Sequence, residues 1–345
     1  MIWLTPVLSI LLTLTFGAIL FAALGFDPLR ALAAYFIRPV STLYGLGELA
    51  LKATPLAMIG VGLALGFRAN VWNIGAEGQF TMGAICGGGV ALIFHDTEGF
   101  WVLPLMALAG IAGGMAYGAI PALLRTRFNA NEILTSLMLT YVATLFLSYL
   151  VHGPWRDPKG LNFPETRMFN ASAQLPGLLD GTRFNLGAIV ALLVVAAGWL
   201  LLARGFIGYQ IKVVGQAPKA AAFAGFDQNR IVWFSFLVGG GLAGLAGLIE
   251  VAGAIGQLHP RISPGYGFTA IIVAFLGRLH PVGILAAALM IALSYLGGEA
   301  AQIEMRLPLA ITGVFQGVLL FFLLGTDVLI RYRVRFGRPA TSRGG

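Results

Sequence analysis

The segment FRANVWNIGAEGQ, residues 67–79, interrupts a long apolar stretch with basic, amide, indole and carboxylate side chains. Residues 51–67 and 71–94 are otherwise apolar enough to cross a membrane, which takes roughly 20 residues of helix. Polar groups at membrane depth are costly unless they face water or one another. The segment therefore predicts two membrane helices joined by a polar break.

Apolar residues dominate the whole chain. Of its 345 residues, 58% are hydrophobic and only 10% are charged, a balance that excludes a soluble globular protein. Because helices satisfy their own backbone groups in lipid, we expect an all-α, polytopic transmembrane helical bundle with about ten membrane segments. The expected segments are residues 3–24, 51–67, 71–94, 101–124, 131–151, 186–203, 231–256, 266–278, 280–298 and 308–330. Some of these segments are expected to be short or broken. Residues 266–278, for example, are too few to cross the membrane alone.

The distribution of Lys and Arg predicts the orientation. With both chain termini in the cytoplasm, 13 of the 22 basic residues lie on the inside, including those of residues 204–230 and the five arginines of the tail, residues 331–345. Residues 152–185 then form an extracytoplasmic loop, and residues 30–47 an interfacial connection. Residues 1–330 are expected to form a single transmembrane domain. The basic residues lie at the ends of apolar segments, which argues against a nucleic-acid partner.

Motifs for covalent chemistry are missing from the sequence. None of the four lysines follows a glycine, so there is no Walker A phosphate loop, and no serine lies in a G-x-S-x-G motif. The four histidines lack zinc-site spacing, and Cys86 is the only cysteine, so no intrachain disulfide can form. We expect a protein that is not an enzyme, has no catalytic or metal-binding residues and binds no cofactor itself.

Six residues with polar groups at membrane depth are candidates for a substrate path. They are Asn70, Trp72, Asn73, Glu77, Gln79 and Glu250. Two interpretations of the cluster at residues 70–79 stay open: a lining of an aqueous path, or a capped helix start with Asn73 as N-cap and Glu77 in the first turn. Glu250 is either a functional acid or a partner in an interhelical hydrogen bond.

A short helix is expected inside the loop at residues 204–230. Pro218 suits the first position of a helix, an alanine-rich run follows, and Gly225 closes it. Such a helix could fit a groove on another protein, or be an ordinary loop element. A weak internal sequence similarity relates residues 65–68 to residues 276–278. Each is the end of an apolar helix followed by a break. Paired broken helices are typical of transporters.

Taken together, the residues resemble the permease family of ATP-binding cassette (ABC) importers that includes branched-chain amino acid, ribose and nucleoside permeases. The resemblance covers nearly the whole chain and rests on residues 67–79, on SPGYGF at residues 263–268 and on AFLG at residues 274–277. The first motif is similar to that of the nucleoside and simple-sugar branch. The resemblance implies a type II ABC importer-like fold.

The resemblance also implies a coupling helix that fits a cleft in the ATPase. The corresponding residues are Gly215, Gln216, Ala217, Pro218, Ala221, Phe223, Ala224 and Gly225. Ala217 replaces an asparagine often found in the family, and Phe223 replaces a tyrosine. These departures leave the docking role intact and change the contacts.

Partners and activity follow from the same resemblance. It implies a second permease chain, related but different, and an ATPase with two nucleotide-binding domains that holds the ATP and magnesium. It also implies an extracytoplasmic substrate-binding protein and a location in the bacterial inner membrane. The expected function is nucleoside import by alternating access. Alternatives are import of simple sugars such as ribose, or proton-coupled secondary transport with Glu77 or Glu250 as relay.

Overall fold

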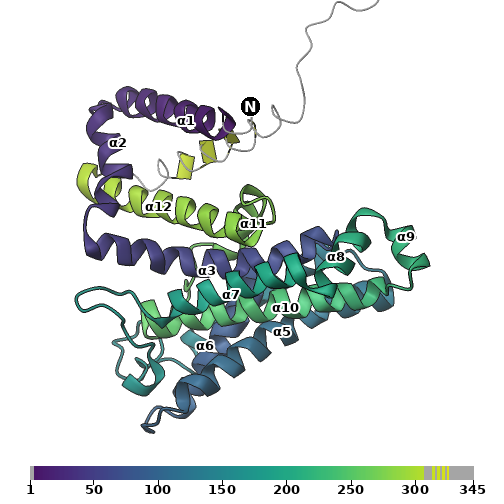
Figure 1. Ribbon diagram of the computed structural model, residues 1–345. Helices are drawn as coiled ribbons and strands as arrows, with labels where there is room; N and C mark the ends of the chain where they lie inside the picture. Colours follow the sequence, from purple (N-terminus) through teal and green to yellow (C-terminus); the bar gives the residue numbers. More distant parts are fainter. Residues whose placement is uncertain (1–3, 307–312, 315–316, 319–320, 323–324, 326–345) are drawn as a thin grey trace, which may run out of the picture. The chain divides into compact units, whose positions relative to one another are not determined.

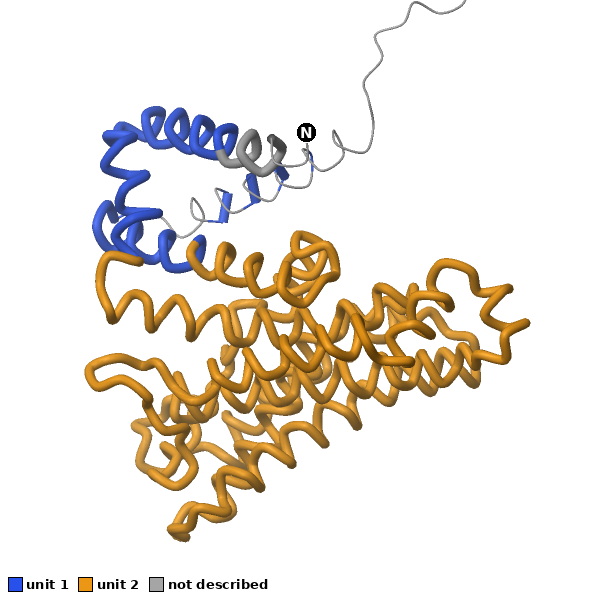
Figure 2. Tube along the Cα trace, in the orientation of Figure 1, with its two compact units in different colours: residues 1–39, 294–345 blue, residues 40–293 orange. Residues whose placement is uncertain are grey.

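The computed structural model describes residues 4–306 and the positions 313–314, 317–318, 321–322 and 325. The expected basic tail at residues 331–345 lies outside the described residues, as does most of the expected segment at 308–330. The chain divides into two compact units (Figure 2). Unit 1 comprises residues 1–39 and 294–345, and unit 2 comprises residues 40–293.

Unit 1 contains α1 (Leu4–Ala23), α2 (Pro28–Phe36) and the end of α12 (Pro281–Met305). Asp27 starts α2, since its side chain accepts a hydrogen bond from the backbone N–H of Leu29 at 2.9 Å. The buried Tyr35 hydroxyl lies 3.0 Å from the Ser294 hydroxyl oxygen. Within the predicted interfacial connection at residues 30–47, the structure places most of α2, a 3-10 helix at Arg38–Val40 and the start of a helix at Leu43.

Unit 2 holds most of the described helices (Figure 1). They are α3 (Leu43–Arg68), α4 (Ala76–Ile93), α5 (Val102–Phe128), α6 (Glu132–His152), α7 (Leu186–Arg204), α8 (Phe206–Gln216), α9 (Pro218–Phe223), α10 (Gln228–Ile249), the π-helix η3 (Glu250–Ile255), α11 (Tyr266–Leu276) and the start of α12. Thr42 caps α3 through a bond from the Gly45 N–H, so this helix begins eight residues before the expected residue 51.

Glycines allow α4, α5 and α10 to pack closely. A Cβ on Gly83 of α4 would lie 2.1 Å from the Gly244 Cα of α10, and one on Gly114 of α5 would lie 2.1 Å from the Gly240 carbonyl oxygen. Such close backbone approach supports helix packing in lipid, where dispersion contacts dominate. The apolar window of α3 is 83% buried, against 22% for those of α5 and α7. Thus α3 is central, and α5 and α7 present apolar surface outward.

Six helices in the described part of the chain are long and apolar enough to span a membrane. They are Leu43–Arg68, Val102–Phe128, Glu132–His152, Leu186–Arg204, Gln228–Ile255 and Pro281–Met305. The expectation of a helical membrane bundle is confirmed, whereas the expectation of about ten segments is not. As expected, α11 is short.

The segments joining these helices lie at two opposite ends of unit 2. At one end, α8 and α9 lie beside the start of α10 (Figure 1). At the other end, residues 153–185 contact the continuation of α10, where the Leu175 N–H donates to the Ala252 carbonyl at 2.9 Å. Residues 205–227 and residues 153–185 therefore lie at opposite ends of α10. This helix is about 33 Å long at 1.5 Å per residue.

Candidate functional site

The polar break between α3 and α4 is a tight backbone turn. Asn70 adopts the left-handed conformation with φ of 57°, and the Val71 N–H returns to the Gly66 carbonyl at 2.9 Å. The N-cap of α4 is Gly75, so the predicted N-cap at Asn73 is wrong by two positions. Asn73 instead lies before the cap and accepts a hydrogen bond from the Gly75 N–H at 3.1 Å.

Asn73 and Gln79 form a closed pair of amides across the start of α4. The Asn73 Nδ2 donates to Gln79 Oε1 at 2.8 Å, and Gln79 Nε2 donates to Asn73 Oδ1 at 3.1 Å. Their residues are only 4% and 1% exposed. Each amide thus satisfies the other inside the helix bundle, which supports the interpretation of a stabilised helix start.

Glu77 connects the starts of α4 and α11. Its buried carboxylate accepts a hydrogen bond from the Gly267 N–H at 2.6 Å. A Cβ on Gly267 would lie 2.2 Å from the Glu77 backbone nitrogen, so only glycine permits this approach. Ser263 holds the same helix start, accepting from the Tyr266 N–H at 2.9 Å. Residues 67–79 and 263–268, which carry the family resemblance, therefore meet here, although Ser263 and Gly267 were not among the predicted site residues.

Asn70 and Trp72 lie at the accessible side of the break. Asn70 is exposed and Trp72 is half-buried, and the indole N–H donates to Asn70 Oδ1 at 3.0 Å. The Trp72 ring packs beside Phe67 and Phe275, with ring centroids 5.1 and 5.8 Å away. Trp72 is thus held by an aromatic cluster that joins α3 to α11.

A second break separates α11 from α12 and lies against the first. Arg278 and Leu279 both have φ of 55°, a left-handed conformation that ends α11. Arg68, the last residue of α3, donates from its Nε to the Leu279 carbonyl at 2.9 Å. The structure thereby brings together the two breaks that the weak internal sequence similarity relates.

Glu250 lies away from the other candidate path residues. It opens η3, whereas Val71 clusters with Ile231 near the start of α10. The charged neighbours of Glu250 are Lys52, Glu48 and Arg183.

The buried Glu48 carboxylate accepts from Arg183 Nε at 2.8 Å and also from Arg183 Nη2. This bond raises the pKa of the Arg183 guanidinium above its usual value, which keeps the charge fixed. The pair ties α3 to the segment before α7. Glu250 therefore shares a charged cluster at the opposite end of α10 from the break.

The predicted coupling residues divide between two helices. Gly215 and Gln216 belong to α8, so the part of the predicted loop that precedes Pro218 is also helical. A Cβ on Gly215 would lie 1.9 Å from the Arg68 carbonyl oxygen, so this glycine packs α8 on the end of α3. The remaining predicted residues lie in α9 or flank it: Ala217, Pro218, Ala221, Phe223, Ala224 and Gly225.

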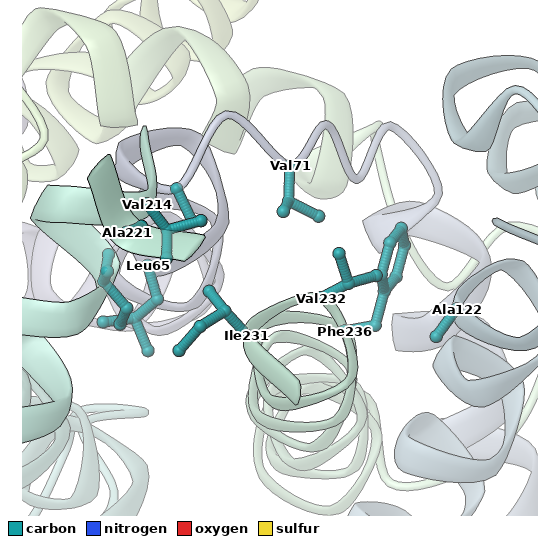
Figure 3. Packing of buried hydrophobic residues seen from close by; sticks show 10 residues of the cluster. Leu65, Val71, Ala122, Val214, Ala221, Ile231, Val232 and Phe236 are labelled. Carbon is teal, nitrogen blue, oxygen red and sulfur yellow. The ribbon is translucent and has the colours of Figure 1, made fainter. Parts of the chain in front are cut away.

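The helix α9 has one buried anchor and an otherwise exposed surface. Ala221 is 2% exposed and belongs to a cluster with Leu65, Val71 and Ile231 (Figure 3). Phe223 is 94% exposed. The helix is therefore fixed to the ends of α3 and α10 while presenting an aromatic ring outward.

A family model described as the permease component of branched-chain amino acid transport systems matches residues 45–324. The chain belongs to this permease family. The match includes both helix breaks and α9, and it confirms the family predicted by the resemblance. This ABC transporter permease is an integral membrane protein and a transport component, not an enzyme.

Curated relatives of the permease are named as sugar or nucleoside permeases. The glucose ABC transporter permease of Haloferax volcanii is 36% identical over 99% of this chain and 94% of its own length. The nucleoside ABC transporter permease protein NupB of Lactococcus lactis is 28% identical, covering 93% and 90%. The guanosine ABC transporter permease NupP of Bacillus subtilis is also 28% identical, covering 96% and 94%.

Two organisms with a nucleoside or guanosine relative also have a second related permease. In Lactococcus lactis, a second nucleoside permease, NupC, is 24% identical over 73% of this chain. No solved structure matches the chain.

Proposed function

We propose that this chain is the permease subunit of an importer that moves nucleosides across the plasma membrane by alternating access. A separate ATPase, which holds the ATP and magnesium, supplies the energy. The arrangement of α9 carries this proposal: its exposed Phe223 suits a cleft on the ATPase, and its buried Ala221 contacts the bundle. Because packed interiors resist deformation, a displacement of α9 would move the ends of α3 and α10.

The paired helix breaks support the proposed path. Half-helix ends at the interface of two repeats form substrate sites in many transporters. Here the breaks are joined by the Arg68 bond to Leu279, and the helix starts by the Glu77 bond to Gly267. We assign Asn70 and Trp72 as the path residues most open to cargo, with Asn73, Gln79 and Glu77 shaping the path behind them. We place Glu250 near the outer mouth.

The substrate class follows from the named relatives. Nucleosides are the first candidate, because NupB and NupP are nucleoside and guanosine permeases. A simple sugar is the second, favoured by the 36% identical glucose permease. Both carry a ring with several hydroxyl groups, which amides such as that of Asn70 can bind.

The proposed partners complete an importer. A second, different permease chain is supported by the occurrence of two nucleoside permeases in Lactococcus lactis. An ATPase and an extracytoplasmic binding protein are proposed from the ABC family itself. We place α9 on the cytoplasmic side and residues 153–185 outside, since these two segments lie at opposite ends of unit 2. The basic residues of the tail support a cytoplasmic side for both termini.

Reconstitution of the whole importer in proteoliposomes tests the function. Uptake of labelled guanosine, uridine, glucose and ribose is compared with and without ATP. We expect ATP-dependent uptake of the two nucleosides that persists with a protonophore. Uptake of glucose or ribose alone would select the sugar candidate. Uptake abolished by the protonophore while ATP is maintained would contradict an ATP-driven importer.

A further inference from the structure

A cationic cavity of about 480 Å³ lies at the corner between α7 and α8. The residues that line it include Arg68, Arg204 and Lys212 and no acidic residue. Arg68 is held in place by its bond to the Leu279 carbonyl, whereas Arg204 and Lys212 form no ion pair with any described residue. Three positive charges around one hollow without a counter-charge favour an anion from outside the chain.

The start of α8 adds a further positive contribution to this cavity. Its N-cap is Gly205, which provides no side-chain hydrogen bond to the first turn. Gly205, Phe206 and Gly208 all line the cavity. The helix has 11 residues, and the N–H groups and dipole of its first turn favour a negative charge there. The anion would thus contact the cationic side chains and also the backbone N–H groups at the start of α8.

The position of the cavity relative to the membrane indicates where that anion comes from. The apolar helix α7 has 19 residues, exposes most of its surface and ends at Arg204, so the cavity lies where a membrane span ends. Phe206 and Tyr209 are exposed beside it and stack with ring centroids 6.4 Å apart. Exposed aromatic residues at the end of a span are typical of the lipid headgroup level.

We propose that this cavity binds the phosphate group of an anionic phospholipid from the surrounding bilayer. Basic pockets between membrane helices are suited to such headgroups, and the lipid tails would follow the apolar face of α7. The site is separate from the Asn73 and Gln79 amides of the proposed cargo path. It is also independent of whether the cargo is a nucleoside or a sugar.

Native mass spectrometry of the full-length chain in neutral detergent tests the proposal. Phosphatidylglycerol and phosphatidylcholine with identical tails are titrated, and inorganic phosphate is added in a third arm. We expect phosphatidylglycerol to bind more tightly than phosphatidylcholine. In the double variant Arg204→Gln/Lys212→Gln, its affinity should fall about fivefold for each cation removed, which corresponds to ~1 kcal/mol per basic residue.

Two further variants make the result specific. The charge-conserving Arg204→Lys/Lys212→Arg variant should retain the preference. The Arg156→Gln/Lys159→Gln variant removes two exposed cations at the opposite end of unit 2 and should bind as wild type. If the first double variant does not fold, Lys212→Gln alone, on the exposed face of α8, should still show the fivefold loss.

Several outcomes would overturn the assignment. Equal affinity for the two lipids would show that the cavity does not select a charged headgroup. An unchanged affinity after Arg204→Gln/Lys212→Gln would place any anionic lipid elsewhere. Binding of inorganic phosphate as tight as that of phosphatidylglycerol would identify a general anion site rather than a lipid site.

Discussion

Replacement of the paired amides Asn73 and Gln79 by leucine should destabilise the chain in a strongly non-additive way. Gln79→Leu leaves the Asn73 amide without its partner in a position that is 4% exposed. A buried unsatisfied polar group costs about 1–3 kcal/mol, so we expect a loss of ~2 kcal/mol in the free energy of unfolding. Asn73→Leu should cost ~3 kcal/mol, because it also removes the acceptor of the Gly75 N–H.

The coupling free energy between the two substitutions, obtained from the double variant, tests whether Asn73 and Gln79 act as a pair. With both amides replaced, no orphaned amide remains, and the loss should be ~3–4 kcal/mol instead of the ~5 kcal/mol sum. The resulting coupling of about 1–2 kcal/mol is close to the maximum of ~1.7 kcal/mol that double-mutant cycles give for hydrogen bonds between membrane helices.

Reversible unfolding in mixed micelles measures these differences. Gln228→Leu is the control, because it removes an exposed amide at the start of α10 and should change stability by less than about 0.5 kcal/mol. Substrate capture by the separate binding protein should remain unchanged in every variant. Additive losses would refute the paired-amide account. Wild-type stability combined with lost transport would show instead that Asn73 and Gln79 act on cargo directly.

Two other predictions concern the helix crossing and the topology. Gly267→Ala should destabilise the chain by ~1–3 kcal/mol in thermal unfolding, because its Cβ would lie 2.2 Å from the Glu77 backbone nitrogen. Gly177→Ala is the control, since its nearest atom would lie at 4.0 Å, and an equal loss in both variants would contradict the close crossing. A cysteine near Lys159 should react with an impermeant thiol reagent from outside intact cells, whereas one near Lys219 should not. The reverse pattern would invert the proposed orientation.

The sequence predicted those parts of the fold that depend on local patterns. Apolar runs located the long membrane helices of unit 2 but not α8, and the polar side chains at residues 67–79 located the break between α3 and α4. Pro218 and Gly225 correctly marked the limits of α9 to within two residues. These features depend on composition and on residues with fixed backbone preferences, so one sequence is enough to see them.

Features that depend on distant partners were not predictable. The start of α3 was missed because Glu48 resembles a residue outside a membrane, yet Glu48 is buried and bonded to Arg183, which lies 135 positions away. The Asn73 and Gln79 pair lies across an N-cap at a spacing of six residues, which follows no helix periodicity. Only the folded chain shows that Gly267 meets Glu77.

The most direct test of the account is the binding of the ATPase to the Phe223→Ala variant of the assembled permease. The Phe223 ring is 94% exposed, so its removal should leave the stability of the chain unchanged. As the aromatic anchor of the interface it should contribute ~2 kcal/mol, and the affinity for the ATPase should fall about 30-fold, with loss of ATP-driven uptake. Phe163→Ala, which removes a 63% exposed ring from the segment at the opposite end of unit 2, should bind the ATPase as wild type. Wild-type affinity and uptake in the Phe223→Ala variant would contradict the proposal that α9 couples this permease to its ATPase.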